Sequence, residues 1–294
     1  MPLVTSTPLF EHARKNGYAV PAFNANSYEM IPALIRAAEA ERSPLILQIG
    51  KKYLSYTPAG EVASLALYLA KKAAVPVCVH LDHGADLAMA RACLESGFTS
   101  VMYDGSSLPD EENIRNTREV VRMAARYGVP VEGEIGQVLQ AEDVPEGEEP
   151  DFLTDPQQAL RFVQETGVSS VAVAVGNIHH MKKKQAKIDF PRIQKLREII
   201  PIPLVIHGCS GVSDEDVSRA VRMGINKVNV ATEYNLAFTD GLREFTTRHP
   251  EEFFPMEPIS SAMERVTAIA RGRIRVLGAG GRYETEAYRE KEKE

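Results

Sequence analysis

A repeated alternation of short strand-like runs and longer amphipathic segments constrains this chain more than any other feature. Eight runs are rich in β-branched residues, several of them nearly continuous in apolar side chains, and they cover residues 19–24, 44–50, 75–83, 99–105, 129–136, 169–176, 202–208 and 226–232. The segments between them place apolar residues at the period of a helix, as in residues 30–42, 59–74 and 111–128. Apolar strands separated by such helices are typical of a parallel sheet whose faces are covered by helices.

Eight successive βα units favour an α/β fold that closes into a (β/α)8 TIM barrel. A doubly wound sheet usually has fewer strands and a switch point, so it fits this repeat less well. The length of 294 residues would also allow two domains, but single barrels of roughly 250 residues are common. We therefore predict one barrel domain over residues 1–284, with a final helix near Ser260–Arg271, followed by a charged tail over residues 285–294.

Charge and cysteine content exclude several classes of protein. The chain has 34 Lys and Arg against 40 Asp and Glu, a formal net charge of −6, which gives no electrostatic reason to bind nucleic acid or a membrane. No apolar run reaches the roughly 18 residues of a membrane helix, and the N-terminus lacks the apolar region of a signal peptide. The odd set Cys78, Cys93 and Cys209 has no CxxC spacing, which indicates a reducing, cytoplasmic setting.

Five of the seven histidines fall at or just beyond the carboxyl ends of predicted strands, namely His80, His83, His179, His180 and His207. In a barrel these strand ends converge on the mouth where catalytic groups lie. Three imidazoles with an open fourth position are a known ligand set for catalytic Zn²⁺. A single histidine is more often a core or loop residue, and spacing alone does not bring His83 and His179 to one ion.

Three carboxylates accompany these histidines. Asp82 precedes His83 directly, and beside a metal it could orient a ligand, act as a ligand or serve as a general acid/base. Asp104 and Glu134 end the fourth and fifth predicted strands and could face the mouth. Each of these two residues could equally cap a helix or solvate a loop.

Small residues after the seventh and eighth strands predict an anion site. Gly208, Cys209, Ser210 and Gly211 follow the seventh strand, and residues 229–232 close the eighth. Small side chains let backbone N–H groups approach an anion, and these two loops are the usual phosphate site of a barrel. The acidic chain must hold any anionic ligand at such a local site.

With these residues in place, the chain resembles the class II (zinc-dependent) ketose-bisphosphate aldolases, the fructose- and tagatose-bisphosphate aldolase family. The resemblance extends from about Phe10 to Gly281. The motifs that carry it are AFNAN (22–26), VHLDHG (79–84), SVMYDGSSLPDEENI (100–114), VEGEIG (131–136), AVAVGNIHH (172–180), LVIHGCSGV (204–212) and KVNVAT (227–232). Their common order makes the set far more specific than any one motif.

The resemblance implies a catalytic machinery built around one Zn²⁺. The implied ligands are His83, His179 and His207, with an alternative or second divalent position at Asp104 and Glu134 and room for a monovalent cation. Asp82 would be the acid/base at the aldehyde carbonyl, and Glu142 would transfer a proton at the ketose C3. The residues implied to bind the substrate are Asn24, His180, Lys183, Gly208, Ser210, Asn229 and Thr232.

The function that follows is reversible cleavage of a phosphorylated ketose to dihydroxyacetone phosphate and an aldehyde, in a cytoplasmic homodimer or homotetramer. Two alternatives stay open: a metal-dependent hydrolase, which usually has an HxH motif after the first strand that this chain lacks, and a barrel that binds metal and sugar phosphate without turnover. The second alternative gains from departures at Gly50, Ser107 and His180, where the family commonly has Ser, His and Gly. A further departure replaces a Gly-Gly pair by Leu139 and Gln140.

Overall fold

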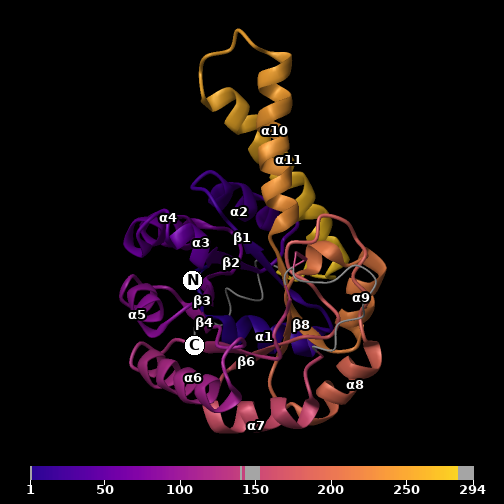
Figure 1. Cartoon of the computed structure of the whole chain (residues 1–294). Coiled ribbons are helices and arrows are strands. Elements are labelled where there is room, and N and C mark those ends of the chain that lie inside the picture. The colour runs from indigo at the N-terminus through magenta and orange to yellow at the C-terminus, as the bar shows by residue number, and fades with distance from the viewer. Residues whose placement is uncertain (1, 140, 143–152, 284–294) are drawn as a thin grey trace.

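Eight parallel strands close into a barrel in the computed structural model, which describes residues 2–139, 141–142 and 153–283 (Figure 1). Each strand pairs with its sequence neighbours, and β8 returns to pair with β1. The strands are β1 (Val20–Asn24), β2 (Leu45–Gly50), β3 (Val77–Gly84), β4 (Ser100–Tyr103), β5 (Val131–Ile135), β6 (Ser170–Val173), β7 (Leu204–Ile206) and β8 (Ile225–Val230). Every predicted run overlaps one of them, and only β3 and β8 extend one residue beyond their runs, which confirms the (β/α)8 barrel. The predicted tail over residues 285–294 lies outside the described residues.

Helices follow the strands and surround the barrel. They are α1 (Ser6–Asn16), α2 (Met30–Ala40), α3 (Lys51–Leu54), α4 (Ala59–Lys72), α5 (Leu87–Glu95), α6 (Asp110–Ala125), α7 (Pro156–Thr166), α8 (Phe190–Ile199), the 3₁₀ turn η1 (Cys209–Gly211), α9 (Asp214–Arg222), α10 (Thr232–Arg248) and α11 (Met256–Val276). The last helix is longer at both ends than the predicted Ser260–Arg271, because Pro255 precedes its first turn and Arg273 and Ile274 are buried in its last turns. Within the described part of the chain, no helix is both long and apolar enough to span a membrane.

Helix starts agree with the local sequence. The Asp86 carboxylate accepts a hydrogen bond from the Met89 N–H at the start of α5, and Ser213 does the same for Asp216 at the start of α9. Asp155 caps α7, in which Pro156 occupies the first turn. Such caps satisfy backbone donors that a helix cannot pair internally.

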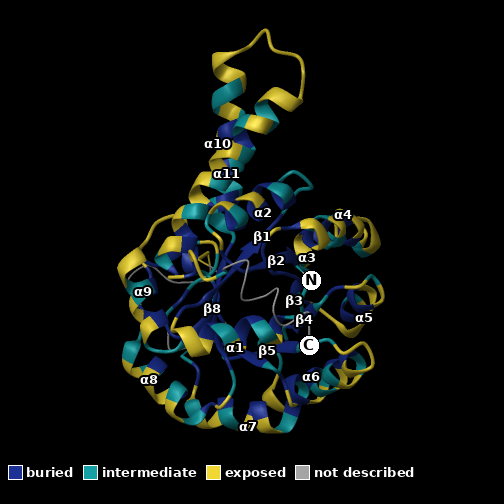
Figure 2. Ribbon diagram, turned by 180° about the vertical axis from the view of Figure 1, so that it is seen from behind, coloured by how far each residue is buried: buried dark blue, intermediate teal, exposed yellow. Residues whose placement is uncertain are grey.

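The interior of the barrel is polar, although its strands are apolar overall. Alternate residues along a strand point to opposite faces, and on β5 and β8 the inner positions are Glu132, Glu134, Lys227 and Asn229, all buried. The outer positions of the strands pack against the surrounding helices and form the main hydrophobic core. Figure 2 shows the strands as buried, in dark blue, within the ring of helices. The barrel interior therefore holds several buried polar side chains, although most strand residues are apolar.

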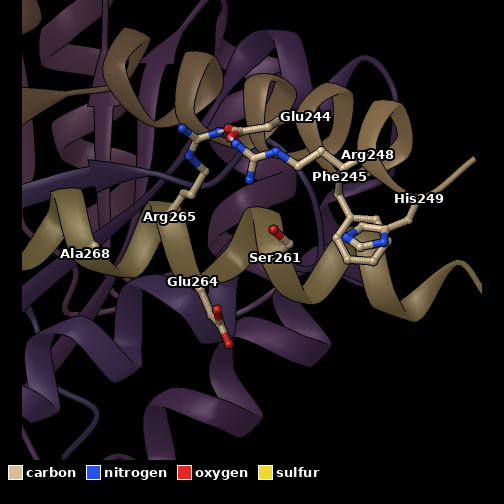
Figure 3. Close-up of a pocket in the computed structure, with 8 residues that line it drawn as sticks. All are labelled: Glu244, Phe245, Arg248, His249, Ser261, Glu264, Arg265 and Ala268. Atoms are coloured by element: carbon tan, nitrogen blue, oxygen red, sulfur yellow. Dashed lines mark hydrogen bonds and ion pairs between the residues drawn. The ribbon is translucent and has the colours of Figure 1, made fainter.

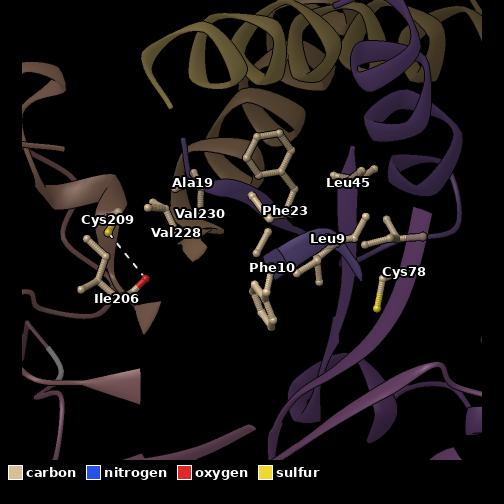
Figure 4. Close-up of a cluster of buried hydrophobic side chains, with 14 of the residues drawn as sticks. Leu9, Phe10, Ala19, Phe23, Leu45, Cys78, Ile206, Cys209, Val228 and Val230 are labelled. Carbon is tan, nitrogen blue, oxygen red and sulfur yellow. Dashed lines mark hydrogen bonds between the residues drawn. The ribbon is translucent and has the colours of Figure 1, made fainter. Parts of the chain in front are cut away.

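Helix α1 packs across the end of the barrel where the strands begin. Its Leu9 and Phe10 are buried, and Figure 4 shows them among the strand side chains Phe23, Leu45 and Val228. The Ser6 hydroxyl accepts a hydrogen bond from Ser100 of β4 at 3.3 Å. This packing leaves the opposite end, where the strands finish, for the functional loops.

An arm made of α10 and α11 projects away from the barrel (Figure 1). The two helices pack closely at Gly241, where a Cβ atom would lie 2.7 Å from the Ala262 Cα. Toward the tip the side chains are largely exposed, and a shallow hollow there is lined by residues that include Glu244, Phe245 and Arg265 (Figure 3). The arm therefore extends beyond the region that the barrel core supports.

Glu41, which follows α2, fastens the base of the arm to the barrel. Its carboxylate accepts hydrogen bonds from Arg271 Nε at 2.7 Å and from Arg275 Nε and Nη2 at 2.9 and 2.7 Å. The Glu41 carbonyl also accepts from the Gly281 N–H. The Arg275 and Arg271 guanidinium groups lower the pKa of Glu41 from 4.5 to about 2, against a smaller opposing effect of burial.

We predict that Glu41→Gln lowers the free energy of unfolding by about 1 kcal/mol at neutral pH, a modest value because both arginines are about half exposed. Since the folded carboxylate has a lowered pKa, its contribution is complete above the ordinary value and is lost as the pH falls toward 2. Urea unfolding at neutral and acid pH should show the two proteins converging in acid. The exposed Glu95→Gln is the control, and an equal loss there would contradict the prediction.

Candidate metal and active site

Three imidazoles meet at the carboxyl end of the barrel. His83 ends β3, His179 follows β6 and His207 follows β7. His207 Nδ1 lies 2.8 Å from His83 Nε2, and the His179 ring centroid is 4.9 Å from that of His83. One nitrogen from each ring lies within 4.8 Å of the others, so the three could hold one metal ion. The barrel closure brings together residues that are up to 124 positions apart along the chain.

A bulge aims His83 at this point. The pairing of β3 with β4 shifts register between Leu81 and Gly84, and His83 adopts a left-handed backbone with φ 51°. Bulges commonly redirect one side chain beside an active site. The His179 backbone is held instead by two hydrogen bonds to the preceding loop, from His179 N–H to the Leu139 carbonyl and from Ala141 N–H to the His179 carbonyl.

The donor set fits a metal ion. His83 Nδ1 lies 2.7 Å from Asp104 Oδ2, and His207 Nε2 lies 3.1 Å from Glu132 Oε1. Carboxylates accept hydrogen bonds, so these two outer nitrogens carry the protons of the neutral rings. When both rings are neutral, the inner nitrogens present lone pairs to each other at 2.8 Å, a contact that a shared cation stabilises, or a proton on His83 in its absence.

Burial and neighbouring charge set the ionisation of the three rings. Burial holds the pKa values of His179 and His207 well below the ordinary value, which favours the neutral, ligating form. Burial also acts to lower the pKa of His83, but the Asp82, Asp104 and Glu134 carboxylates outweigh it and raise the pKa to about 9. A cation at this position is therefore favoured by the surrounding negative charge.

Asp104 and Glu134 form a second possible ligand group with His83. The Asp104 carboxylate orients His83 and accepts hydrogen bonds from the Ser106 N–H and hydroxyl, and the bonds to His83 and Ser106 lower its pKa despite burial. Glu134 is buried, and its Oε2 atom has no hydrogen-bond partner. Burial and the nearby Asp104 raise the pKa of Glu134 to about 8, so a bound cation would be needed to keep it ionised at neutral pH.

Asp82 lies beside the histidine cluster rather than within it. Its Oδ1 atom is 4.0 Å from His83 Nε2 and accepts a hydrogen bond from Asn229 Nδ2 at 3.1 Å, while its Oδ2 accepts from Asn24 Nδ2 at 2.7 Å. Burial alone would raise the pKa of Asp82, but His83, His207, Lys227 and the Asn24 amide lower it. The carboxylate is thus ionised and fixed at one edge of the cluster.

Residues after β7 and β8 form a tight cradle. Gly208 has φ 62°, and a Cβ there would lie 2.4 Å from the Ile178 carbonyl oxygen, so only glycine lets the loop after β7 meet the loop after β6. Ser210 is buried, with its hydroxyl 3.4 Å from the Glu233 N–H, and Thr232 is the first residue of α10. The predicted anion residues Gly208, Ser210 and Thr232 therefore lie on adjoining loops.

The remaining predicted substrate residues fall into two groups. Asn24 and Asn229 are buried and both donate to Asp82, so they lie next to the histidine cluster. His180 and Lys183 are exposed on the loop after β6. His180 has φ 60°, a conformation that suits glycine best, and this explains why a smaller residue is common there.

Three other predicted residues lie apart from the cluster. Glu142 is exposed, and the residue before it, Ala141, bonds to His179 through the backbone. His80 lies inside β3 rather than at its end, and its Nδ1 pairs with the Ser100 hydroxyl at 2.8 Å, so it does not join the metal group as its strand-end placement suggested. Gly50 lies at the mouth, where a Cβ would be 3.7 Å from Asp82 Oδ2 and would fit without strain.

Two buried residues near the cluster escaped the sequence analysis. Glu132 and Lys227 form an ion pair across the barrel, with Lys227 Nζ 2.8 Å from both carboxylate oxygens. Both residues stand two positions before a predicted site residue on the same strand, Glu134 and Asn229. The period of a strand would have placed them on the inner face, which is the signal that could have found them.

These features define a (β/α)8 barrel with a group of side chains that could hold a metal ion at the carboxyl ends of the strands, where barrel enzymes carry their catalytic groups. The sequence profile of the family described as fructose-bisphosphate aldolase class-II matches residues 4–282, and the chain belongs to this family of lyases.

Solved structures support this assignment. The YdjI aldolase from Escherichia coli K12 is 32% identical, with a TM-score of 0.84 over 96% of this chain and 100% of that one. A putative fructose-1,6-bisphosphate aldolase from Coccidioides immitis is 28% identical, with a TM-score of 0.85 over 94% and 96% of the two chains. Fructose-bisphosphate aldolase from Campylobacter jejuni, 23% identical over 95% and 97%, shares the fold with a TM-score of 0.82.

We predict that removing the imidazole of His83, His179 or His207 by substitution with alanine weakens Zn²⁺ binding by more than about 100-fold. The basis is that loss of a group that merely orients a ligand already costs about 10–100-fold. Metal analysis after dialysis and competition with a chelating dye measure the effect. His180→Ala is the matched control, since its exposed ring adjoins His179; loss of metal in that variant alone would overturn the assignment.

Proposed function

We propose that this protein catalyses the reversible, metal-dependent aldol cleavage of a phosphorylated ketose, of the fructose 1,6-bisphosphate or tagatose 1,6-bisphosphate type. The products are dihydroxyacetone phosphate and an aldehyde. The observation that carries the proposal is the convergence of three imidazoles beside the buried, ionised Asp82 carboxylate at the barrel mouth. Family membership supports the same chemistry.

His83, His179 and His207 would hold the Zn²⁺ ion, and Asp104 with Glu134 would supply an alternative or second divalent position. Bound Zn²⁺ would polarise the ketose carbonyl and stabilise the negative charge that develops during cleavage. The protein's own part is to fix these side chains: Asp104 orients His83, and the backbone pairs with Leu139 and Ala141 fix His179. We also propose that the protein binds a monovalent cation in addition to Zn²⁺.

Asp82 is the acid/base residue of this proposal. In the cleavage direction its carboxylate would accept the proton of the C4 hydroxyl, and in condensation it would return that proton to the aldehyde oxygen. Hydrogen bonds from Asn24 and Asn229 hold the carboxylate in place, and its lowered pKa keeps it ionised and ready to accept. Glu142 would transfer the proton at the ketose C3.

The phosphate of the three-carbon ketose would bind on the cradle after β7 and β8. Gly208, Ser210, Asn229 and Thr232 would contact it or the adjoining substrate atoms, with Lys183 and the His180 backbone on the neighbouring loop. Backbone N–H groups at the start of α10 favour an anion at that point. Local donors of this kind are required because the whole chain carries a net charge of −6.

We predict that metal-replete protein, incubated with fructose or tagatose bisphosphate, produces triose phosphate in a coupled assay and that EDTA abolishes the signal. Asp82→Ala should keep the metal and lose about 10²–10⁴-fold in turnover, the usual contribution of a general acid/base. Asp86→Ala, which removes the nearby cap of α5, is the matched control and should retain turnover. Bound metal with no triose phosphate from any ketose phosphate would refute the proposal and favour the non-catalytic barrel.

We further propose that the protein is a cytoplasmic homodimer or homotetramer in which residues 1–284 act as one domain. The tip of the arm supports self-association, because Phe253, Phe254 and Met256 are 79%, 52% and 59% exposed there. The two phenylalanine rings lie together, with centroids 4.3 Å apart. A clustered apolar tip on an arm that extends from the core is typical of a surface that another subunit covers.

We predict that replacing Phe253 and Phe254 together by serine shifts the molar mass measured by light scattering toward that of a monomer. The reason is that the substitution removes the exposed apolar area at the tip. Tyr56→Ser is the control, since Tyr56 is 83% exposed but lies on the barrel beside α3 rather than on the arm. An unchanged mass in the double variant would place the subunit contact elsewhere.

A further inference from the structure

The Lys227 and Glu132 pair lies below the histidine cluster, inside the barrel. Lys227 comes from β8 and Glu132 from β5, so the pair crosses the barrel interior. Lys227 Nζ lies 2.8 Å from each Glu132 oxygen, and the two side chains are 0% and 2% exposed. Glu132 Oε1 also lies 3.1 Å from His207 Nε2, whose side chain is fully buried.

We propose that this ion pair positions the metal site: Glu132 holds His207 with Nδ1 facing the ion, and Lys227 holds Glu132. Both are positioning residues, since neither belongs to the histidine group that could hold the ion. The inference rests on the proposed metal site and deepens it. It does not depend on which ketose the protein cleaves, or on whether it cleaves one.

His207 must carry its proton on Nε2 if its Nδ1 is to bind a metal. His207 Nε2 has two close neighbours, Glu132 Oε1 at 3.1 Å and Asn229 Nδ2 at 3.2 Å. The amide donates one of its two N–H groups to the Asp82 carboxylate and has a second that could face His207, whereas the charged Glu132 oxygen can only accept while it is paired with Lys227. A charge-assisted bond from Nε2–H to Glu132 is the stronger arrangement, and it leaves the Nδ1 lone pair free for a metal.

Lys227 compensates the charge of the buried Glu132 carboxylate. A carboxylate as deeply buried as Glu132 is costly unless an opposite charge compensates it. Lys227 bonds to both oxygens, which fixes the carboxylate plane as well as its charge. The Ser170 hydroxyl, 3.4 Å from Oε2, is a third contact, and no water is needed to complete the set.

His83 and His207 differ in how far solvent reaches their rings. His83 and its orienting partner Asp104 are 17% and 16% exposed, so solvent can help to orient that ring. His207 has no such access, because its side chain is 0% exposed. Its orientation is therefore set from inside the barrel, by the residues that touch its outer nitrogen.

Two double variants separate positioning from stability. Glu132→Gln with Lys227→Met and Glu132→Leu with Lys227→Met both remove the two charges together and avoid an unpaired buried charge. Only the glutamine retains an oxygen that can accept from His207 Nε2–H. We expect Zn²⁺ affinity, measured with a chelating dye in the absence of substrate, to be about 10–100-fold weaker in the leucine variant than in the glutamine variant. Equal affinities in two folded variants would overturn the inference.

Arg273→Met is the matched stability control. It removes the cation of another ion pair, in which the buried Arg273 bonds to the partly exposed Glu233 at the base of the arm. It should lower the melting temperature and leave Zn²⁺ affinity unchanged. If it weakens Zn²⁺ binding as much as the leucine variant does, loss of stability explains both results and the positioning role is refuted.

A measurement on the unaltered protein keeps the test decisive if a variant fails to fold. Nitrogen NMR of histidine-labelled, zinc-loaded protein identifies which ring nitrogen of His207 carries the proton. The inference requires the proton on Nε2, and a proton on Nδ1 would overturn it. Protein that binds Zn²⁺ with this tautomer but cleaves no ketose phosphate would refute the proposed function alone, whereas protein that binds no Zn²⁺ would refute both.

Discussion

The closed barrel imposes one constraint on which the rest of the structure depends: every second strand residue points into a space that water scarcely reaches. Polar side chains in that space must satisfy one another, because an unpaired buried polar group is costly. Asn24, Gln48 and Asp82 form one such chain of hydrogen bonds, and Lys227, Glu132 and His207 form another. Asn229 lies within reach of both, since its amide nitrogen approaches Asp82 and His207.

This network explains why the histidines at the mouth have defined orientations. Each of two rings turns its outer nitrogen to a carboxylate, Asp104 for His83 and Glu132 for His207, and thereby turns its inner nitrogen to the common centre. The third ring, His179, depends on the backbone of the loop after β5. The loop that carries Glu142 is therefore linked to His179, so a shift of this loop would also shift the His179 ring.

The departures from the family pattern lie around this network and leave it intact. His180 occupies a left-handed position beside the cradle, and Gly50 lies where a Cβ would make ordinary contact with Asp82 and Asn24. Ser107 is exposed on the loop after β4. None of the three belongs to the groups of side chains that could hold a metal ion, so under the proposed function they bear on which ketose fits rather than on whether a metal can bind. The arm is a separate feature, with an apolar tip that the barrel core does not cover.

The sequence alone determined the barrel and the identity of the groups at its mouth, because the periods of strands and helices and the order of the motifs are local properties of the chain. It could not show that His83 and His179 reach one point, since that depends on closure of the barrel and on the bulge before Gly84. It placed His80 at a strand end, whereas the register places that ring deeper, against Ser100. The Lys227 pair with Glu132 is likewise a product of tertiary structure, because only closure sets strands β5 and β8 face to face across the interior.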